Sequence, residues 1–335
     1  MEKRVSGEEQ AVRLGTGGSP VRNVLKKITQ DRVLMLVVML AALFLSMSVA
    51  YPKTFPTWDN ISAVLLDAAQ SGILTVGMMC LLIAGVFDIS IGATLAFGGI
   101  IAGTILKTWG MSPFAAIIGG LLSGLLIGCI NGLIVTKIKV NAMIATLATQ
   151  YILRGVTQII APSGVANLPD SFKPFGQTVL LGLQSPFWVM LVVVALIWFL
   201  MSKTRYFRQF YYIGAKPKAA KLSGIKVDQV VFMAFAMMGL LAGLAGTLLA
   251  SRLSNAVVLA GTGVEMKAIA AAILGGASLT GGVGKIQGAL LGAVFMSFIN
   301  NALVICRVPT FYQSIVVGAI LIFALGLDRL SKKEA

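Results

Sequence analysis

Long apolar stretches alternate with short polar connections along the whole chain, a pattern typical of helices that cross a membrane. A bilayer core requires about 20 apolar residues in helical conformation. By this measure the sequence predicts ten spans, at residues 33–50, 62–86, 91–107, 113–136, 142–160, 186–201, 230–251, 264–280, 286–304 and 310–327. The predicted fold is all-α, a polytopic membrane protein with about ten transmembrane helices.

Two of these spans combine charged residues with a candidate interruption of the helix. The second contains Asp67 and has a candidate break at Ser71-Gly72, and the eighth contains Glu265 and Lys267 before a run of glycines. Because ionisable groups are costly inside a bilayer, these two spans are the ones most open to a different structure.

The spans form one unit without a large soluble domain. We expect a cytoplasmic N-terminal segment at 1–32, a single transmembrane domain at 33–330 and a cytoplasmic C-terminus at 331–335. The polar N-terminal segment precedes an apolar run without a small-residue cleavage site, which favours a first transmembrane helix over a secretory signal.

Lysine and arginine are distributed unevenly between the connections. If the N-terminus is cytoplasmic, the inside segments hold 20 basic residues and the outside segments hold five. Cytoplasmic loops of membrane proteins carry such an excess, so the bias predicts cytoplasmic termini and an even number of crossings. Lys137, Lys218 and Lys333 are then cytoplasmic and Lys173 is external.

Composition supports a membrane protein and excludes several classes of function. Mean hydropathy is +0.91, 57% of residues are apolar and 12% are charged, whereas a soluble domain carries roughly twice that charge. The net charge of +15 lies between the spans without interleaved stacking aromatics, so it indicates orientation in a membrane rather than nucleic-acid binding.

Cysteine and histidine usage argues against catalysis and metal binding. The three cysteines, Cys80, Cys129 and Cys306, are far apart, and histidine is absent. This pattern indicates neither a disulfide framework nor a metal site, and it removes histidine-based acid–base chemistry. The sequence also lacks a G-x4-GK[ST] phosphate-binding loop, so we expect no cofactor and no bound nucleotide.

Glycines recur inside the spans with helical spacing. Gly120, Gly124 and Gly128 fall on one helix face, and Gly239 and Gly243 fall on another. Small residues allow helix backbones to approach closely in lipid, so these faces predict tight helix packing.

A shift of 169 residues aligns several positions of the first half with the second. The shift corresponds to about five spans, which would give two inverted five-helix halves. The matched positions are Gly77 with Gly246, Gly92 with Gly261, Gly119 with Gly288, Leu121-Leu122 with Leu290-Leu291, and Ile130-Asn131 with Ile299-Asn300.

The longest polar connection, 202–229, is strongly basic. Within it, residues 215–225 can form a short helix, with Pro217 in the first turn and Gly224 at the end. Its small face would pack closely while its lysines stay in water. Such a helix either docks on a separate cytoplasmic ATPase or lies on anionic lipid. The candidate ATPase-coupling residues are Pro217, Ala219, Ala220, Leu222, Ser223 and Gly224.

Polar residues inside or at the ends of spans are candidates for a translocation path. Asp88 can instead cap the following helix, Glu265 can favour the positive end of a helix, and Arg154 can extend to the interface. Amides in spans also commonly hydrogen-bond between helices. The candidate path residues are Asp88, Asn131, Asn141, Glu265, Asn300 and Asn301.

Four ordered segments carry a resemblance to one family. They read IAGVFDISIGA at 83–93, NGLIVTKIKVNAMIATLATQYILRG at 131–155, GAKPKAAKLSGIKV at 214–227, and SRLSNAVVLAGTGVEMKAIAAAILGGASLTGGVGK at 251–285. Together they resemble bacterial ABC sugar permeases of the ribose/galactose/arabinose/xylose class. The chain departs from that pattern at five positions, where Phe207 and Ala215 replace glycines, Met143 a phenylalanine, Lys216 an asparagine and Lys267 an aspartate.

The resemblance implies the permease subunit of an ABC importer in the bacterial inner membrane. The expected partners are an ABC ATPase, a periplasmic or extracellular sugar-binding protein, a second permease copy or paralogue, membrane lipid and a pentose or hexose substrate. An ion-coupled secondary transporter is the alternative, and it would need buried acidic pairs or broken helices around a cation site. A membrane-embedded enzyme is a weaker alternative, because catalytic groups are lacking.

Overall fold

The computed structural model describes residues 32–333, and most of this range is helical. The predicted N-terminal segment, except Arg32, and the last two residues lie outside the described range. The long helices are α2 (Arg32–Ala50), α3 (Trp58–Ile83), α4 (Ile91–Lys107), α5 (Pro113–Leu133), α6 (Ala142–Ile160), α8 (Ser185–Lys203), α11 (Val227–Leu253), α13 (Ile286–Ile305) and α14 (Thr310–Lys333). The shorter elements are η1 (Ile134–Ile138), η2 (Asp170–Phe172), α7 (Lys173–Gln177), β1 (Val179–Leu180), β2 (Leu183–Gln184), α9 (Arg205–Ala215), α10 (Pro217–Leu222) and α12 (Val264–Leu274).

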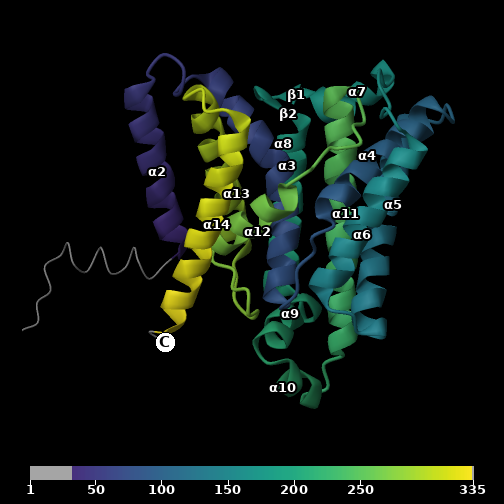
Figure 1. Cartoon of the computed structure of the whole chain (residues 1–335), viewed down its shortest axis with the longest axis vertical. Coiled ribbons are helices and arrows are strands. Elements are labelled where there is room, and N and C mark those ends of the chain that lie inside the picture. Colours follow the sequence, from purple (N-terminus) through teal and green to yellow (C-terminus); the bar gives the residue numbers. More distant parts are fainter. Residues whose placement is uncertain (1–31, 334–335) are drawn as a thin grey trace, which may run out of the picture.

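The helices form one elongated bundle with two distinct ends (Figure 1). We call the end that contains β1 and β2 the hairpin end, and the opposite end the α10 end. The start of α2 and the end of α14 both lie at the α10 end (Figure 1). The described chain therefore begins and ends on the same side of the bundle.

Among the described residues, six helices are long and apolar enough to cross a membrane: α2, α3, α5 with η1, α8, α11 and α13. Ile91–Lys107 and Phe311–Ile322 are shorter apolar helices. Helix α6 has 19 residues but is less apolar, since it contains Gln150, Arg154 and Gln158. The structure is thus a polytopic helical bundle, as predicted.

The predicted span at 264–280 is wrong in extent. Helix α12 has 11 residues, about 16 Å, roughly half of a bilayer core. The helix stops at Gly275 and Gly276, where Gly276 adopts a φ of +98°. It lies at mid-height in the bundle, with irregular backbone on both sides (Figure 1).

The candidate break at Ser71-Gly72 does not occur. Helix α3 continues for 26 residues from Trp58 to Ile83. The Ser71 hydroxyl donates to the Asp67 carbonyl one turn earlier, at 3.1 Å, and the space beside Gly72 is filled by the Met190 side chain. Packing against α8 therefore holds this part of α3 in helical form.

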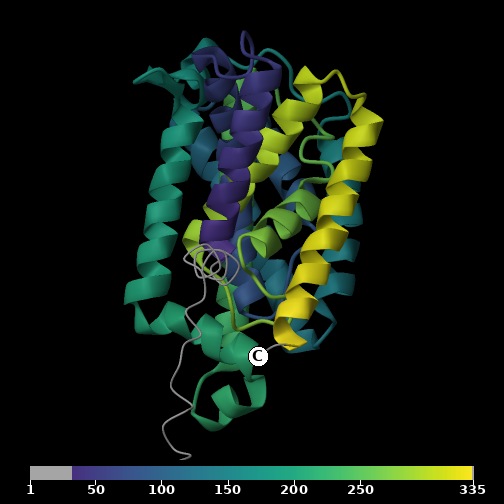
Figure 2. The same cartoon turned by 90° about the vertical axis from the view of Figure 1, so that its left-hand side faces the viewer.

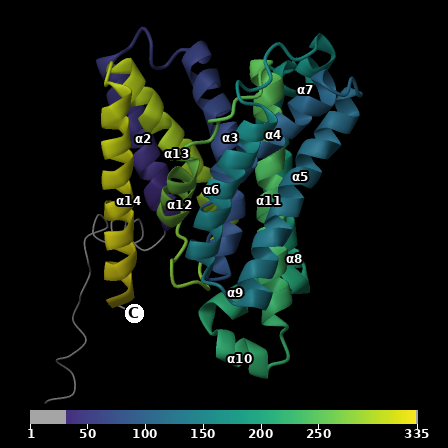
Figure 3. The same ribbon diagram turned by 45° about the vertical axis from the view of Figure 1, so that its right-hand side comes forward.

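Close glycine packing between α5 and α11 is confirmed. A Cβ added to Gly124 would lie 2.7 Å from the Cα of Gly243, and one added to Gly239 would lie 2.7 Å from the Cα of Gly128. Larger side chains at these positions would force the two backbones apart. The helices run side by side over most of their length (Figure 3).

Helix bounds repeat along the chain at the spacing of the glycine matches. Adding 169 to the bounds of α3 gives 227–252, and α11 occupies Val227–Leu253. The same shift moves α5 with η1 onto 282–307, where α13 lies, and α6 onto 311–329, where α14 lies. Helix α3 runs from the hairpin end to the α10 end, whereas α11 runs back (Figure 1).

Candidate functional site

Two helices of the polar connection stand below the bundle at the α10 end (Figure 1). Helix α9 was not predicted. It begins after Thr204, whose hydroxyl accepts from the Phe207 N–H, and it buries Phe210 and Ile213 against the core. Burial raises the pKa of Tyr211, which stays a hydrogen-bond donor and donates to the Gly284 carbonyl at 3.1 Å. These contacts fix α9 to the rest of the chain.

Four glycines join α9 to the membrane helices, and we call them the glycine junction: Gly85, Gly214, Gly281 and Gly282. A Cβ added to Gly281 would lie 2.8 Å from the Cα of Gly214 and 2.9 Å from the Cα of Gly85. The Gly282 N–H donates to the Ile83 carbonyl at 2.8 Å. The end of α3, the end of α9 and the α12–α13 connection therefore meet backbone to backbone.

Helix α10 is shorter than predicted. It has six residues, with Pro217 in its first turn, and the chain turns at Gly224 with a φ of +83°. Pro217 lies in the first turn and Gly224 follows the helix end, as predicted, but the helix does not span 215–225. The break at Lys216, between α9 and α10, arises because proline at 217 disfavours helical backbone in the residue before it.

The outward surface of α10 differs from the predicted small face. Leu222 is 90% exposed, and Ala219 and Ser223 are also exposed. Ala220 is only 5% exposed and packs mainly against the rest of the chain, whereas the prediction placed it on the outward face with Ala219. An open groove of about 420 Å³ runs beside the helix, lined by Tyr212, Ala215, Lys216, Ala219, Ala220, Ser223 and Ile225.

The predicted path residues Asp88 and Asn131 belong to a buried hydrogen-bond network. The Asp88 carboxylate accepts from the Ser90 N–H at 2.7 Å and the Ser90 hydroxyl at 2.6 Å. The Asn131 amide donates to Asp88 at 3.3 Å and to Ser90 at 2.9 Å, and its carbonyl accepts from Thr149 at 2.6 Å. The network ties the start of α4 to α5 and α6, and every named group in it has a partner.

A polar cavity lies between α3, α12 and α13 and contains the predicted residue Asn300. Helix α3 contributes Asp67, Gln70, Ser71 and Thr75, α12 contributes Val264, Lys267, Ala268 and Ala271, and α13 contributes Ala293, Met296, Ser297 and Asn300. The cavity has a volume of about 80 Å³. The side-chain amide oxygen of Asn300 is buried without a hydrogen-bond partner, and the Ser71 and Ser297 hydroxyls lie 3.4 Å apart. The cavity thus offers acceptors, donors and charges of both signs.

Most cavity residues were missed by the sequence interpretation, although their spacing carries a signal. On α3, Asp67, Ser71 and Thr75 recur every four residues, which places them on one helix face. On α13, Ser297 and Asn300 lie three residues apart. Each set of polar residues is too short to indicate a site by itself. The cavity is identified only because the two sets face each other in the structure.

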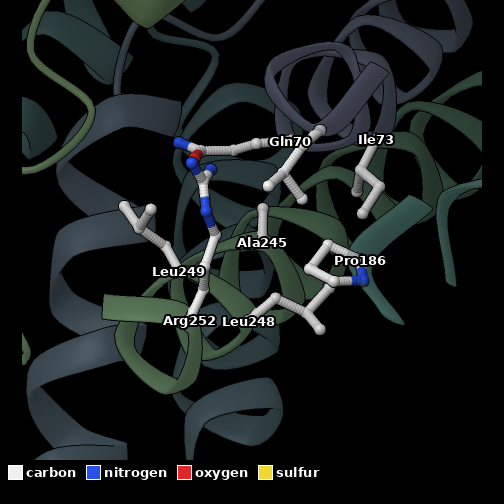
Figure 4. Close-up of a pocket in the computed structure, with 8 residues that line it drawn as sticks. Gln70, Ile73, Pro186, Ala245, Leu248, Leu249 and Arg252 are labelled. Carbon is white, nitrogen blue, oxygen red and sulfur yellow. The ribbon is translucent and has the colours of Figure 1, made fainter. Parts of the chain in front are cut away.

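A second, smaller cavity adjoins the first at Gln70 (Figure 4). The side chain of Arg252 from α11 extends toward Gln70 there, while Ile73, Pro186, Ala245 and Leu248 supply apolar walls (Figure 4). Gln70 therefore separates a charged side chain of α11 from the polar cavity.

Glu265 lies apart from the cavity, at the start of α12. It is 7% exposed, and one of its carboxylate oxygens has no hydrogen-bond partner. A Cβ added to Gly92 would lie 2.8 Å from that oxygen, which places Glu265 against the first turn of α4. Arg154 does not extend to the interface, since its guanidinium donates to the carbonyls of Val258 and Ala260 at 2.8 and 2.9 Å.

Asn141 and Asn301 have local partners. Asn141 is exposed and caps α6 by accepting from the Met143 N–H at 2.9 Å. The Asn301 side-chain amide donates to the Asn60 side chain at 2.7 Å and links α13 to α3 outside the polar cavity, while its own side-chain oxygen is buried without a partner. The part of the chain that the structure describes holds no group of three or more His, Cys, Asp and Glu residues arranged to bind a metal.

Comparisons with known proteins agree with this architecture. Residues 60–325 match the family described as branched-chain amino acid transport system / permease component. The ribose import permease of Escherichia coli K12 is 37% identical over 285 residues, covering 84% of this chain and 88% of the relative. No solved structure matches the chain.

Two further relatives carry different sugar names. The D-allose transport system permease of Escherichia coli K12 is 37% identical over 297 residues, covering 88% of this chain and 90% of the relative. The L-arabinose ABC transporter permease of Azospirillum brasilense is 33% identical over 300 residues, covering 89% of this chain and 88% of the relative. The chain therefore belongs to the branched-chain amino acid transport system / permease component family and, within it, to the multi-pass inner-membrane permeases of sugar ABC transporters of the ribose, arabinose and allose class.

Proposed function

We propose that the chain is the membrane-spanning subunit of an importer that moves a pentose or hexose, driven by ATP hydrolysis in a partner subunit. The relatives named for ribose, allose and L-arabinose support a small sugar. The ATPase supplies the energy, since the sequence lacks a phosphate-binding loop of its own.

The observation that carries this proposal is the connection between α10 and the membrane helices. Leu222 and the groove beside α10 present an apolar contact surface ringed by exposed lysines, as expected of a docking site for another protein. The glycine junction leads from α9 directly to the end of α3, whose middle turns line the polar cavity. A movement imposed on α10 therefore reaches the cavity through rigid, closely packed backbone.

The orientation follows from charge. Ten basic residues of the described chain lie in connections at the α10 end: Lys137, Lys139, Lys203, Arg205, Arg208, Lys216, Lys218, Lys221, Lys226 and Lys285. By the positive-inside rule this end faces the cytoplasm and the ATPase, and the hairpin end faces the sugar-binding protein. A cysteine replacing Lys218 should resist an impermeant thiol reagent in whole cells, and labelling from outside would reverse the assignment.

The polar cavity is the part of the sugar path that this subunit supplies. Sugar hydroxyls both donate and accept, and the cavity pairs an unpartnered Asn300 oxygen with the Ser71 and Ser297 hydroxyls. The cavity residues offer a sugar few strong, fully enclosed hydrogen bonds, so a sugar that binds there can also dissociate. Asp88, Asn131 and Asn141 have structural partners, and Asn301 and Glu265 lie outside the cavity, so the proposed path does not include these five residues.

The repeated helix bounds support two inverted five-helix halves, α2–α6 and α8 with α11–α14. The connection with α9 and α10 is then an insertion into the second half. In each half the third helix, α4 or α12, begins inside the bundle rather than at its surface, and Gly92 and Gly261 pack together there. Broken helices that meet at a repeat axis are typical of transport proteins.

A second permease chain, a copy of this one or a paralogue, covers the side on which the α11–α12 connection is exposed. Leu259 is 70% exposed in irregular backbone that leads into the bundle, and such backbone does not face lipid within a bilayer. A photoreactive residue at 259 should therefore crosslink to another permease chain, whereas one at Leu196 of α8 should crosslink to lipid. Lipid adducts alone at 259 would contradict this.

Copurification tests the proposed function. The tagged permease is isolated from its own membranes in mild detergent, and the bound proteins are identified and assayed for ATP hydrolysis. We expect a stoichiometric ABC ATPase, and activity that rises when sugar-loaded binding protein is added. Isolation of the chain without any ATPase, together with sugar uptake driven by an ion gradient, would support the secondary-transporter alternative.

A further inference from the structure

The hairpin between α7 and α8 has an unusual turn. Strands β1 and β2 pair Val179 with Gln184 and Leu180 with Leu183, and the two turn residues Leu181 and Gly182 have φ values of +50° and +79°. A turn with two positive φ values favours Asn or Gly at its first position, and leucine is poorly suited to it. The turn thus holds a large apolar side chain where a small polar one would be easier to accommodate.

The tip of this hairpin is apolar and uncovered. Val179 is 61% exposed, Leu180 56% and Leu181 79%, and these three residues are called the hairpin tip. The segment from Thr178 to Ser185 carries no charged side chain. Residues 32–333 leave more than half of each of these three aliphatic side chains uncovered.

Two tryptophans flank the hairpin at the ends of membrane helices. Trp58, in the first turn of α3, lies against Gly182, where an added Cβ would be 3.1 Å from the indole ring. The indole N–H of Trp188, in the first turn of α8, donates to the Leu180 carbonyl at 3.1 Å. Trp109, between α4 and α5, is also exposed at this end. Tryptophan gathers at the boundary between bilayer and water, so these side chains mark the level of that boundary.

The hairpin extends sideways at this level, outward past the top of α8, rather than away from the bundle along its axis (Figure 2). We propose that the hairpin tip inserts into the lipid at the bilayer surface of the hairpin end and anchors the connection between α7 and α8. Lipid is favoured over a soluble protein partner because the tip lies between interfacial tryptophans, is uncharged and points toward the surrounding bilayer. This inference requires only that the chain spans a membrane, and it is independent of the transported substrate.

Depth measurement by spin labelling tests the proposal. The full chain carries Leu181→Cys in a background of Cys129→Ala and Cys306→Ser. Cys80 is kept, because its burial shields it from the label. After attachment of a nitroxide, the protein is placed in lipid nanodiscs without any other protein. Collisions of the label with oxygen, which concentrates in lipid, are compared with collisions with a water-soluble nickel chelate.

The matched control is Asp170→Cys, at a side chain that is 89% exposed in the same connection of the hairpin end. We expect the label at 181 to be several-fold less accessible to the nickel chelate than the label at 170, and more accessible to oxygen. Equal accessibility to the nickel chelate at the two positions would show that the tip lies in water and overturn the proposal. Protection of position 181 from both reagents would show that protein covers the tip, and would also overturn it. Val179→Cys provides a second position if the turn tolerates no substitution.

Discussion

Gly214 of α9 and Gly281 of the α12–α13 connection lie backbone against backbone, and a Cβ added to Gly281 would sit 2.8 Å from the Cα of Gly214. Three of the four sequence segments that resemble the sugar permeases meet here, because Gly85 from the first of them also touches Gly281. The meeting point lies between the proposed ATPase surface and the helices that line the cavity. We therefore expect it to transmit movement and to tolerate no side chain.

Substitution of Gly281 by alanine tests the glycine junction. Gly281→Ala combines an unfavourable φ of +86° with overlap of two neighbouring backbones, whereas Gly224→Ala has a similar φ of +83° and open space around it. The shared conformational penalty is about 1–2 kcal/mol. We expect thermal unfolding in detergent to show a clearly larger loss of stability for Gly281→Ala. Equal losses would mean that the backbones can separate without cost.

Substitutions at Leu222 and Ala220 distinguish the role of α10 in ATPase docking from its role in folding. Leu222→Glu places a charge on a 90% exposed position, so the permease should accumulate normally while losing the ATPase and sugar uptake. Ala220→Glu buries a charge within the chain itself, at a cost of several kcal/mol, and should lower the amount of folded permease. The amount of permease in the membrane and the amount of ATPase that copurifies with it distinguish the two variants. Normal uptake with Leu222→Glu would place the ATPase contact elsewhere.

The Asp88 network should matter for stability rather than for transport selectivity. Asp88→Leu leaves the Ser90 N–H, the Ser90 hydroxyl and part of the Asn131 amide without their acceptor in a buried site. Each lost partner costs about 1–3 kcal/mol, so we expect severe loss of folded protein. Asn141→Ala, at an exposed helix cap, should cost only about 1 kcal/mol. If the two variants are equally stable on heating, the network carries little folding energy.

Asn300 and Asn301 are neighbours in sequence with different surroundings, which makes them a matched pair. Asn300→Leu removes from the polar cavity an amide whose oxygen has no hydrogen-bond partner, and it should reduce sugar uptake with little effect on stability. Asn301→Leu breaks the hydrogen bond to Asn60 and should cost about 1 kcal/mol of stability while uptake per folded molecule stays near normal. The reverse pattern would remove the cavity from the proposed path.

Much of the fold was predictable because membrane helices are marked by long apolar runs. Each of the ten predicted spans overlaps a helix, and six helices of the described chain are long and apolar enough to cross a membrane. The glycine faces of α5 and α11 pack as expected. The length of helix α12 was overestimated, because uncharged, mostly apolar sequence continues past Leu274 while the glycines there end the helix. Helix α9 was missed although Thr204 offers a cap and Phe210 and Ile213 have helical spacing.

The candidate site was less predictable, since it depends on which face of each helix meets which neighbour. Asn131 and Asn300 occupy matching positions in the 169-residue shift, yet one is fully hydrogen-bonded and the other faces a cavity. Similarly, Ala219 and Ala220 are adjacent alanines, and only the three-dimensional position of the six-residue α10 makes one exposed and the other buried. Sequence spacing cannot separate such pairs.

The central claim is that this chain moves a sugar only when an ATPase drives it. The most direct measurement is uptake of labelled ribose, allose and L-arabinose into proteoliposomes that contain the permease with its copurified ATPase and binding protein, with and without ATP on the ATPase side. We expect accumulation of at least one sugar that requires ATP and disappears when Leu222→Glu removes the ATPase. Accumulation by the permease alone, driven by a sodium or proton gradient without ATP, would contradict the account.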